Sequence, residues 1–575
     1  MSDATLTLER VLARFQGQGR TQLLPALHAV QEALGYISPE AARAVARALG
    51  IPEADVYGVA TFYALFSTEP QGRHQVHVCY GPVCRQHGAD QVTEALERVW
   101  HVRVGETTED REWTLKTAPC LGLCEHAPVA WVDGRAVALD PNASPETLAA
   151  RVEAAARRET EEPTPVVGGS VRVLTAWEDP SQPRSLGAYR AAGGYQAFEH
   201  ARAGQAPDEV IAAVEASGLF GRGGAAFPTG RKWRYAAQAE GRPKYVVVNA
   251  DESEPGTFKD RALLEADPHA VLEGALLAAY AIQAERVYVY VRGEYGRAYR
   301  ILRRALDEAR AAGYIGPRSD NGPWRVEVEI RRGAGAYVCG EETALFESIE
   351  GKRGYPRVKP PYPTTHGLFG KPTVINNVET LAAVPFIVRE GPEAYRRYGT
   401  SDSPGPKLFP VSGDVARPGV YEAPFGITLR ELLELAGGPV GSVRAILLGG
   451  AAGSFVGPEA LDVPLTLEDL RAAGLSLGSA AVMVFNAERD LEQVLLDVAE
   501  FFREESCGKC YPCQLGTQRQ WELLRLMRAR RAPDQARARL EDIAVAMTEA
   551  SLCGLGQTAG LAIQSALRRW PELFT

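Results

Sequence analysis

Apolar residues recur three or four positions apart through the first 70 residues, in VLARF, LLPALHAVQEAL and AARAVARALG. This spacing places them on one face of successive helices, and Ser38-Pro39 is a typical helix start. From His74 the pattern changes to strand-like alternation in HQVHVCY, followed by a helix in DQVTEALERVW and short strands such as VAWVDG. We therefore expect an N-terminal helical segment, 1–72, and a small α/β domain, 73–157.

The rest of the chain divides into a linker and three further parts. RETEEPTPVVGGS (158–170) is rich in acids, prolines and glycines, which is typical of a linker. Strand-like runs KYVVVNA, RVYVYVRG and WRVEVEIRRG, with helices between them, predict an α/β domain over 171–395. A hairpin feeding a helix, with the runs RAILLGG and AAVMVFN, predicts a small α+β domain over 400–487, and 488–575 is predicted to be helical.

Composition and charge narrow the class of protein. The 575 residues are 45% hydrophobic and 23% charged, as in a soluble multidomain protein, and the net charge of -9 comes without a basic stripe for nucleic acid. The richest apolar run, 271–284, is too short to span a bilayer, and the N-terminus lacks a signal-peptide apolar region. We expect a cytoplasmic protein without direct membrane insertion, in which disulfides are disfavoured.

Four of the nine cysteines lie in the first 124 residues. Cys79 and Cys84 end a strand and occupy the loop after it, and Cys120 and Cys124 lie in TAPCLGLCEHAP. Glycines and prolines leave backbone N–H groups in these loops free to point at inorganic sulfides, which suits a [2Fe–2S] cluster. A structural zinc held by the same four cysteines is the alternative, and spacing alone does not separate the two.

A second set of four lies near the C-terminus. Cys507, Cys510 and Cys513 have the C-x2-C-x2-C spacing typical of a [4Fe–4S] site, and Cys553 in SLCGLGQ offers the fourth thiolate. Zinc is again the alternative, although zinc sites more often use two separated pairs. Cys339 has no partner left, and we interpret it as a small packing residue.

Two glycine-rich loops offer close backbone approach to a ligand. GLFGRGGAAFPTGRKW (218–233) follows a helical stretch rather than a strand, so it lacks the context of a dinucleotide fingerprint. RRGAGAYVCGEETALFESIEG (331–351) has a strand, glycines and then a helix start that would attract a phosphate, but its glycine spacing is not that of a standard NAD fold. An ordinary tight turn is the alternative for each loop.

Polar residues follow a predicted buried strand in NADESEPGTFKDR (249–261). Acids at the C-terminal end of such a strand lie where α/β sheets bind ligands, although a solvated charged loop has the same composition. KPTVINNVETL (371–381) places two adjacent asparagines, which suit a flavin edge but are also common in turns.

Together these motifs are similar to those of the NADH-oxidising module of the complex I family, with two subunits fused in one chain. Residues 1–157 resemble the thioredoxin-like [2Fe–2S] subunit, and residues from about 185 to 575 resemble the flavin subunit through GRGGAAFPTGRKW, NADESEPGTFKDR, GAGAYVCGEETAL, KPPYP, PTVINNVETL, ESCGKCYPC and SLCGLG. The resemblance implies an α/β multidomain protein. Its parts would be N-terminal helices with a thioredoxin-like domain, an FMN-binding α/β domain, a ubiquitin-like (β-grasp) α+β domain and a C-terminal helical bundle.

The resemblance also implies site residues. It places FMN on Gly223, Lys232, Asn249, Asp251, Glu252, Tyr337, Gly340, Glu341, Asn376, Asn377 and Thr380. It places NAD(H) against the flavin, among Gly224, Phe227, Tyr235, Glu254, Glu342, Lys359 and Tyr362. The family often has phenylalanine where Tyr235 and Tyr362 stand, and glycine where Ala226 stands.

The implied activity is that of an NADH dehydrogenase, or diaphorase, subunit. Hydride passes between NAD(H) and FMN, so no catalytic side chain is predicted, and single electrons pass to one [4Fe–4S] and one [2Fe–2S] cluster. No molybdopterin or nickel motif is present, so the second half-reaction belongs to a partner iron–sulfur subunit.

Three parent complexes use such a module. Fusion and the sequence GLGQTA after Cys553 favour the soluble enzymes, and we expect a formate dehydrogenase with its alpha-type catalytic subunit as partner. NAD-reducing [NiFe] hydrogenase and respiratory complex I are the alternatives. A non-enzymatic iron–sulfur electron-transfer module, which would not need the flavin and nicotinamide loops, and a zinc-stapled scaffold are the alternatives from other classes.

Overall fold

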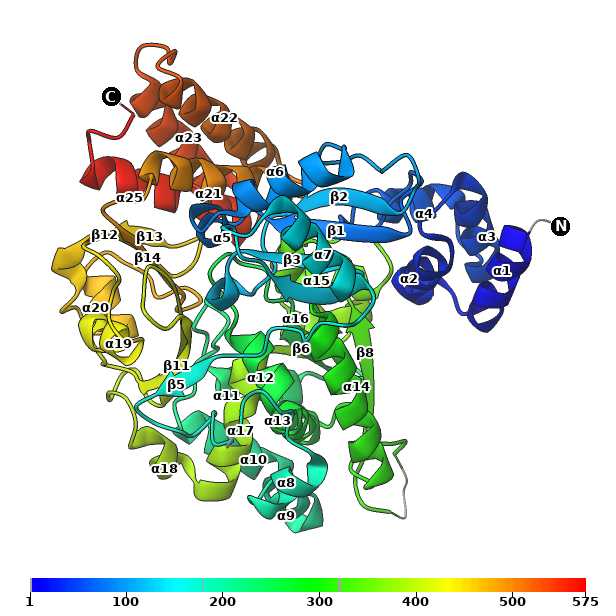
Figure 1. The fold of residues 1–575 in the computed structure, drawn as a ribbon. Helices are drawn as coiled ribbons and strands as arrows, with labels where there is room; N and C mark the ends of the chain where they lie inside the picture. The colour runs from blue at the N-terminus through cyan, green and yellow to red at the C-terminus, as the bar shows by residue number, and fades with distance from the viewer. Residues whose placement is uncertain (1–2, 178, 319–321, 575) are drawn as a thin grey trace.

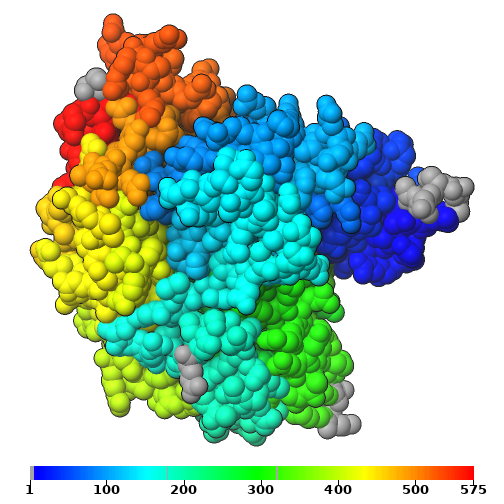
Figure 2. Space-filling view, in the orientation of Figure 1, coloured from blue at the N-terminus to red at the C-terminus, as the bar shows by residue number. Residues whose placement is uncertain are grey.

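The computed structural model describes residues 3–177, 179–318 and 322–574. The N-terminal helices form a lobe at one side, and the blue-to-cyan α/β domain lies between this lobe and the C-terminal helices (Figures 1 and 2). The large green α/β domain lies below it, and the yellow small β domain lies beside both. The two parts of the chain that contain the cysteine sets, 73–157 and 488–575, are therefore neighbours.

The N-terminal segment is helical, as predicted. Ser38 caps one helix, because its hydroxyl accepts a hydrogen bond of 3.1 Å from the Ala41 amide and Pro39 occupies the first turn. The elements are α1 (Asp3–Leu12), η1 (Ala13–Phe15), η2 (Arg20–Gln22), α2 (Leu23–Leu34), α3 (Pro39–Leu49) and α4 (Glu53–Ala60).

The second domain is a four-stranded sheet in the order β2-β1-β3-β4, with β1 parallel to β2 and antiparallel to β3. One sequence-based placement is wrong in detail, since Cys84 lies in a short helix that starts at Pro82 rather than in a loop. The elements are β1 (His74–Cys79), α5 (Pro82–Gln86), α6 (Ala89–Trp100), β2 (Trp113–Ala118), η3 (Cys124–His126), β3 (Val129–Val132), β4 (Arg135–Ala138) and α7 (Pro145–Ala156).

The large α/β domain contains a parallel sheet in the order β8-β7-β6-β9. The three predicted strands are confirmed, and a fourth, β9, contains the two asparagines of KPTVINNVETL that the sequence placed only as flavin or turn residues. The strands are β6 (Tyr245–Ala250), β7 (Arg286–Val291), β8 (Glu327–Arg332) and β9 (Thr373–Asn377). The helices are α8 (Leu186–Ala191), α9 (Gln196–Gly204), α10 (Pro207–Ala216), α11 (Thr229–Gln238), α12 (Lys259–Ala266), α13 (Pro268–Ile282), α14 (Gly296–Ala311), η4 (Tyr337–Gly340), α15 (Glu342–Ile349), α16 (Pro363–His366), η5 (Leu368–Gly370), α17 (Val378–Glu390) and α18 (Pro392–Arg396).

The small β domain is a six-stranded sheet in the order β13-β12-β14-β10-β11-β5. The predicted hairpin and following helix are confirmed. The predicted linker 158–170 contains a short strand, because Val167–Gly169 pairs with β11 at the sheet edge. The β-grasp description stays a prediction. The elements are β5 (Val167–Gly169), β10 (Pro406–Gly413), β11 (Gly419–Pro424), α19 (Leu429–Leu435), β12 (Val443–Leu448), β13 (Ser454–Val456), η6 (Pro458–Ala460), α20 (Leu467–Ala472) and β14 (Val482–Asn486).

The C-terminal part is helical, as predicted, and packs beside β13 (Figure 1). Its helices are α21 (Leu491–Glu505), α22 (Tyr511–Arg528), α23 (Ala536–Ala550), α24 (Gly554–Thr558) and α25 (Leu561–Arg569). None of the helices in the described ranges has the length and apolar character needed to cross a membrane.

Candidate functional site

At one position in the parallel sheet, the connections that follow two neighbouring strands run in opposite directions. In chain order its strands run third, second, first and fourth, so β6 and β9 are neighbours, with Asn249 opposite Asn377 at their C-terminal ends. Loops that leave such a pair diverge and open a crevice, which is where open α/β sheets bind ligands.

A cavity of about 460 Å³ lies at this position. Its volume is in the range of small-molecule sites. Ten of the residues implied by the family resemblance line it: Gly223, Gly224, Asn249, Asp251, Glu252, Glu254, Tyr337, Gly340, Glu341 and Asn377.

Glycines let the backbone approach closely around this cavity. A Cβ on Gly223 would lie 3.3 Å from Asn377 Cβ, and one on Gly340 would lie 3.4 Å from the Asp251 carbonyl oxygen. The Asn249 amide donates to the Gly340 carbonyl at 2.9 Å, which ties the loop after β8 to the end of β6. The result is a narrow space with rigid walls, which suits a flat ring system.

Buried carboxyl groups face the same space. Burial raises the pKa of Asp251, and its Oδ2 has no hydrogen-bond partner in the structure. Burial also raises the pKa values of Glu252 and Glu254 to about 7. A buried acceptor without a partner needs a donor, and the hydroxyls of a ribityl or ribose chain would supply one. The donor set therefore fits a flavin nucleotide.

A second group of predicted residues lies outside the cavity lining. Lys359 Nζ lies 2.7 Å from Glu342 and 2.9 Å from Glu341, and Lys232 lies 3.8 Å from Glu342. These lysines lower the pKa of Glu342 although burial opposes the shift. The group therefore presents fixed charges of both signs.

Exposed aromatic rings accompany this charged group. Phe227 is 40% exposed and Tyr362 is 59% exposed, and the Phe227 ring lies 6.0 Å from Lys232 Nζ. Tyr235 is 48% exposed on α11, which packs against α16, the helix that Tyr362 caps. Exposed rings on adjacent elements provide stacking faces for a nucleotide base.

Two predicted residues are buried behind the cavity rather than in its lining. Asn376 Oδ1 accepts a hydrogen bond of 2.8 Å from the Trp233 indole. The Thr380 hydroxyl accepts one of 2.8 Å from the Arg222 amide. Both side chains therefore hold the glycine loop and α11 in place.

Sequence reasoning missed much of the cavity wall. Segments far apart in the chain supply these lining residues: Arg222, Ala225, Ser253, Thr257, Lys259, Asp260, Val338, Gly449, Ala452, Gly453, Ser476, Gly478, Ser479, Gly554, Leu555, Thr558 and Leu561. The glycine runs at 449–453 and after Cys553 are signals that could have indicated close backbone approach.

The four N-terminal cysteines are buried and lie together. The Cys120 thiol interacts with those of Cys124 and Cys79, and these interactions hold its pKa well below the usual range. The Gly122 amide donates to Cys120 Sγ at 3.3 Å. Such backbone donors to cysteine sulfur are the environment that an iron–sulfur cluster uses.

The four C-terminal cysteines line one small cavity together with Pro356, Leu552 and Leu555. Cys513 lies at the start of α22, and Cys553 caps α24, so α22 and α23 bring the fourth cysteine back to the first three. A single zinc ion would need its sulfurs within about 2.3 Å of one point. In the described ranges no three His, Cys, Asp or Glu side chains are arranged to hold one ion. The sequence spacing of this set, with three cysteines within seven residues and a fourth forty residues later, is typical of a [4Fe–4S] cluster.

Cys339 lies apart from both sets. It is 1% exposed, and a Cβ on Gly354 would lie 2.5 Å from its Sγ, so the thiol fills a tight space beside that glycine. This environment supports the interpretation as a packing residue.

Four sequence families match successive parts of the chain. Residues 8–154 match the thioredoxin-like [2Fe-2S] ferredoxin family, and 214–386 match the Nuo51 FMN-binding domain. Residues 408–446 match the SLBB domain, and 493–575 match the NADH-ubiquinone oxidoreductase-F iron-sulfur binding region. The predicted cofactors, FMN, NAD(H), [2Fe–2S] and [4Fe–4S], are thereby confirmed.

Relatives match over long stretches. An NADH-quinone oxidoreductase protein of Aquifex aeolicus is 47% identical over 389 residues, which is 68% of this chain and 90% of the relative. The NAD-reducing hydrogenase HoxS subunit alpha of Cupriavidus necator is 36% identical over 570 residues, 98% of this chain and 93% of the relative. A crystal structure of NAD+-reducing [NiFe]-hydrogenase superposes with a TM-score of 0.84 at 35% identity, over 97% of this chain and 93% of that one. The chain belongs to the family of NADH-oxidising flavin and iron–sulfur (diaphorase) subunits shared by complex I and NAD-reducing hydrogenase, with the flavin and thioredoxin-like subunits fused.

Proposed function

We propose that this chain exchanges hydride between NAD(H) and FMN in the 460 Å³ cavity and exchanges single electrons with the [4Fe–4S] site at the cavity's edge. One observation carries the proposal. Leu555, two residues after Cys553, lines both the flavin cavity and the cavity of the four C-terminal cysteines. The two cavities therefore adjoin at Leu555.

The chain's own residues orient the nucleotides. The glycine loop at 223–224 and the asparagines that end β6 and β9 would hold the flavin, while Asp251 would accept a hydrogen bond from its side-chain hydroxyls. FMN supplies the ability to take two electrons as hydride and to release them singly. The protein has to position the rings and exclude water, so no nucleophilic side chain is needed.

The rim residues would bind the dinucleotide. Phe227, Tyr235 and Tyr362 offer exposed rings, and Glu342 and Lys359 form an ion pair of 2.7 Å beside them. Glu254 lines the same cavity, where it would contact the nicotinamide end.

For the parent complex we propose a multisubunit NAD-reducing hydrogenase. The support is length: the hydrogenase relative aligns with 98% of this chain, including the N-terminal helices, whereas the NADH-quinone oxidoreductase relative aligns with 68%. Formate dehydrogenase, which the sequence motifs favoured, is not supported over this alternative, and the relatives named above carry no such description. The partner would be an iron–sulfur subunit of the same complex.

The isolated chain tests the activity. We expect the purified, iron-loaded protein to contain FMN and acid-labile sulfide and to reduce an artificial acceptor with NADH. Absence of FMN would leave a bare electron-transfer module, and about two zinc ions without sulfide would indicate a scaffold.

The complex tests the parent enzyme. The chain should be purified from its natural source with its partners, and NAD+ reduction should be assayed with hydrogen and with formate. Reduction by hydrogen alone supports the proposal, and reduction by formate alone replaces it.

A further inference from the structure

One buried arginine joins the [2Fe–2S] ligand loop to the flavin loop. Arg292, directly after β7, is 2% exposed. Its guanidinium donates to the Cys120 carbonyl oxygen and, at 2.9 Å, to the Glu252 carbonyl oxygen. The same cation therefore contacts a loop of each predicted redox site.

Other residues of the flavin domain fix the same ligand loop. Arg261 Nε donates to the Gly122 carbonyl at 2.9 Å, and its guanidinium also pairs with Glu125. Gly122 has a φ of +65°, and a Cβ there would lie 2.2 Å from the Tyr295 hydroxyl oxygen, so the tyrosine is packed directly onto the loop. The loop is thus held in one position relative to Arg292, and a charge at Arg292 acts at a fixed distance.

Acidic groups surround Arg292. Glu294 on its own loop lies 3.1 Å away and is its direct ion-pair partner. Asp251 after β6 and Glu505 at the end of α21 interact with Arg292 through their charges. Because Arg292 and Asp251 are buried and Glu294 and Glu505 are only partly exposed, removing one charge changes the local potential far more than the same change at the surface.

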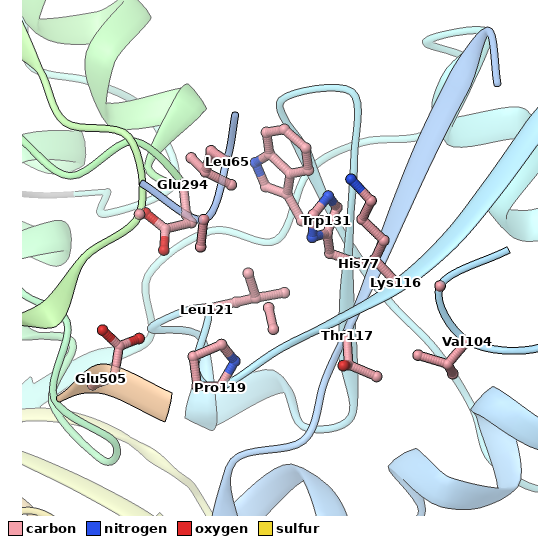
Figure 3. A pocket seen from close by; sticks show the side chains of 14 residues that line it. Leu65, His77, Val104, Lys116, Thr117, Pro119, Leu121, Trp131, Glu294 and Glu505 are labelled. Carbon is pink, nitrogen blue, oxygen red and sulfur yellow. The ribbon is translucent and has the colours of Figure 1, made fainter. Parts of the chain in front are cut away.

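Glu294 can be altered without disturbing packing. It lines a cavity of about 340 Å³ between the thioredoxin-like and flavin domains, with Glu505, Leu121 and Trp131 around the same space (Figure 3). Its Oε2 has no hydrogen-bond partner, although the side chain is 10% exposed. An amide of the same shape therefore fits there.

We propose that Arg292 is a positioning residue that sets the reduction potential of the [2Fe–2S] cluster, with Glu294 opposing it. When one electron enters from the flavin, the cluster gains one negative charge, while no bond forms or breaks and no proton moves. The guanidinium charge favours that state, and the Glu294 carboxylate disfavours it. This inference rests on the proposed function.

The test measures the potential rather than the turnover. The full chain is titrated anaerobically with a reductant, and the [2Fe–2S] signal is recorded by electron paramagnetic resonance at each potential. The signal gives the ratio of reduced to oxidised cluster at that potential. For Arg292→Gln we expect this ratio to fall about tenfold at fixed potential, which is about 59 mV for a one-electron couple. Arg292→Lys keeps the charge and should recover most of the ratio, and Glu294→Gln should shift it upward.

Arg300→Gln is the matched control. Arg300 donates to the Gly134 carbonyl of the thioredoxin-like domain at 3.2 Å and pairs with Glu162 in the segment after that domain, and none of its contacts among the described residues is with the cysteine loop. This variant should leave the potential unchanged, whereas a shift as large as that of Arg292→Gln would overturn the proposal.

The expected shifts in potential have opposite signs for Arg292→Gln and Glu294→Gln, and this difference distinguishes an electrostatic role of Arg292 from a purely structural one. A purely structural role predicts that Arg292→Lys behaves like Arg292→Gln and that Glu294→Gln has no upward effect, and either result would overturn the proposal. If Arg292→Gln fails to assemble the cluster, Glu294→Gln decides alone. A wild-type protein without the [2Fe–2S] signal would overturn the proposed function itself.

Discussion

Glu254, in the loop after β6, accepts a hydrogen bond of 2.8 Å from the backbone amide of Ala452 in the small β domain. Both residues line the flavin cavity, so this bond closes the cavity between two domains. The contact depends on Gly450, whose φ is +85° and where a Cβ would lie 2.6 Å from the Glu254 carboxyl carbon. Protonation or deprotonation of Glu254 therefore takes place within the cavity and at the boundary between the flavin domain and the small β domain.

The first prediction concerns the pH dependence of NADH binding. Burial raises the pKa of Glu254 to about 7, so the carboxyl is neutral below this pH and an anion above it. An anion accepts hydrogen bonds from ribose and carboxamide groups more strongly, so the KM for NADH should fall as the pH rises through 7. Glu254→Gln should abolish this inflection and raise KM at pH 8 by roughly tenfold, about 1.4 kcal/mol.

Steady-state kinetics from pH 5.5 to 8.5 with an artificial acceptor would measure this effect. Glu285→Gln, on a residue outside the cavity lining, serves as the control and should retain the wild-type profile. Persistence of the inflection in Glu254→Gln would show that another group controls it.

The second prediction concerns the glycine loop. A methyl group on Gly223 would crowd Asn377 at 3.3 Å and would also occupy the side of the cavity where the flavin is proposed to lie. Gly223→Ala should weaken FMN binding by about tenfold, because overpacking of this kind costs about 1–3 kcal/mol.

Gly221→Ala is the matched control for that loop. Its Cβ would meet the Phe227 carbonyl oxygen at 3.5 Å, an ordinary contact, and Gly221 does not line the cavity. Fluorescence titration of the deflavinated protein with FMN compares the two variants. Equal affinities would argue that the flavin does not approach Gly223.

The third prediction separates the cysteine sets. Cys553→Ser should remove the [4Fe–4S] signal and leave the [2Fe–2S] signal in place, because Cys553 lines one cavity with Cys507, Cys510 and Cys513. Cys339→Ala should retain both signals, since this thiol is buried among Tyr63, Tyr290 and Ser348. Iron content and electron paramagnetic resonance of the reduced proteins would measure the outcome, and loss of a cluster in Cys339→Ala would refute the packing role.

The sequence was informative where local spacing determines chemistry. The sequence alone was enough to locate three cysteines within seven residues and a run of glycines before a helix start. The family resemblance named Asn377, but local spacing alone could not place it at the cavity, because that position depends on β9 lying next to β6, a pairing between residues more than 100 apart in the chain. Local propensity does not encode such a register.

Contacts between domains were also beyond the sequence. Arg292 followed a correctly predicted strand, but its contact with Cys120 joins residues 172 positions apart. Likewise, Ala452 and Ser479 reach the cavity because the small β domain packs against the loop after β6. These parts of the cavity wall arise from tertiary packing, and the glycine runs were their only signal in the sequence.

The last prediction concerns stability between the flavin domain and the small β domain. Glu379 at the start of α17 is fully buried and binds Lys407 of β10 at 2.7 Å and Lys259 of α12 at 3.0 Å. The two lysines hold the pKa of Glu379 below its usual range against the effect of burial. Burial lowers the pKa of Lys407 to about 7, and the Glu379 carboxylate opposes this shift.

Glu379→Gln should therefore lower the free energy of unfolding by about 3–5 kcal/mol, since it leaves the buried Lys407 ammonium without an anion and Lys259 paired with Asp260 alone. The loss should be smaller at pH 9 than at pH 6. Lys407 binds fewer protons in the folded state than in the unfolded state above its lowered pKa, so rising pH stabilises the variant as this lysine becomes neutral. Urea unfolding at the two pH values would measure it. Asp462→Asn, which breaks the exposed pair with Arg430, should change the free energy far less, and an equal effect of the two substitutions would contradict the role of burial.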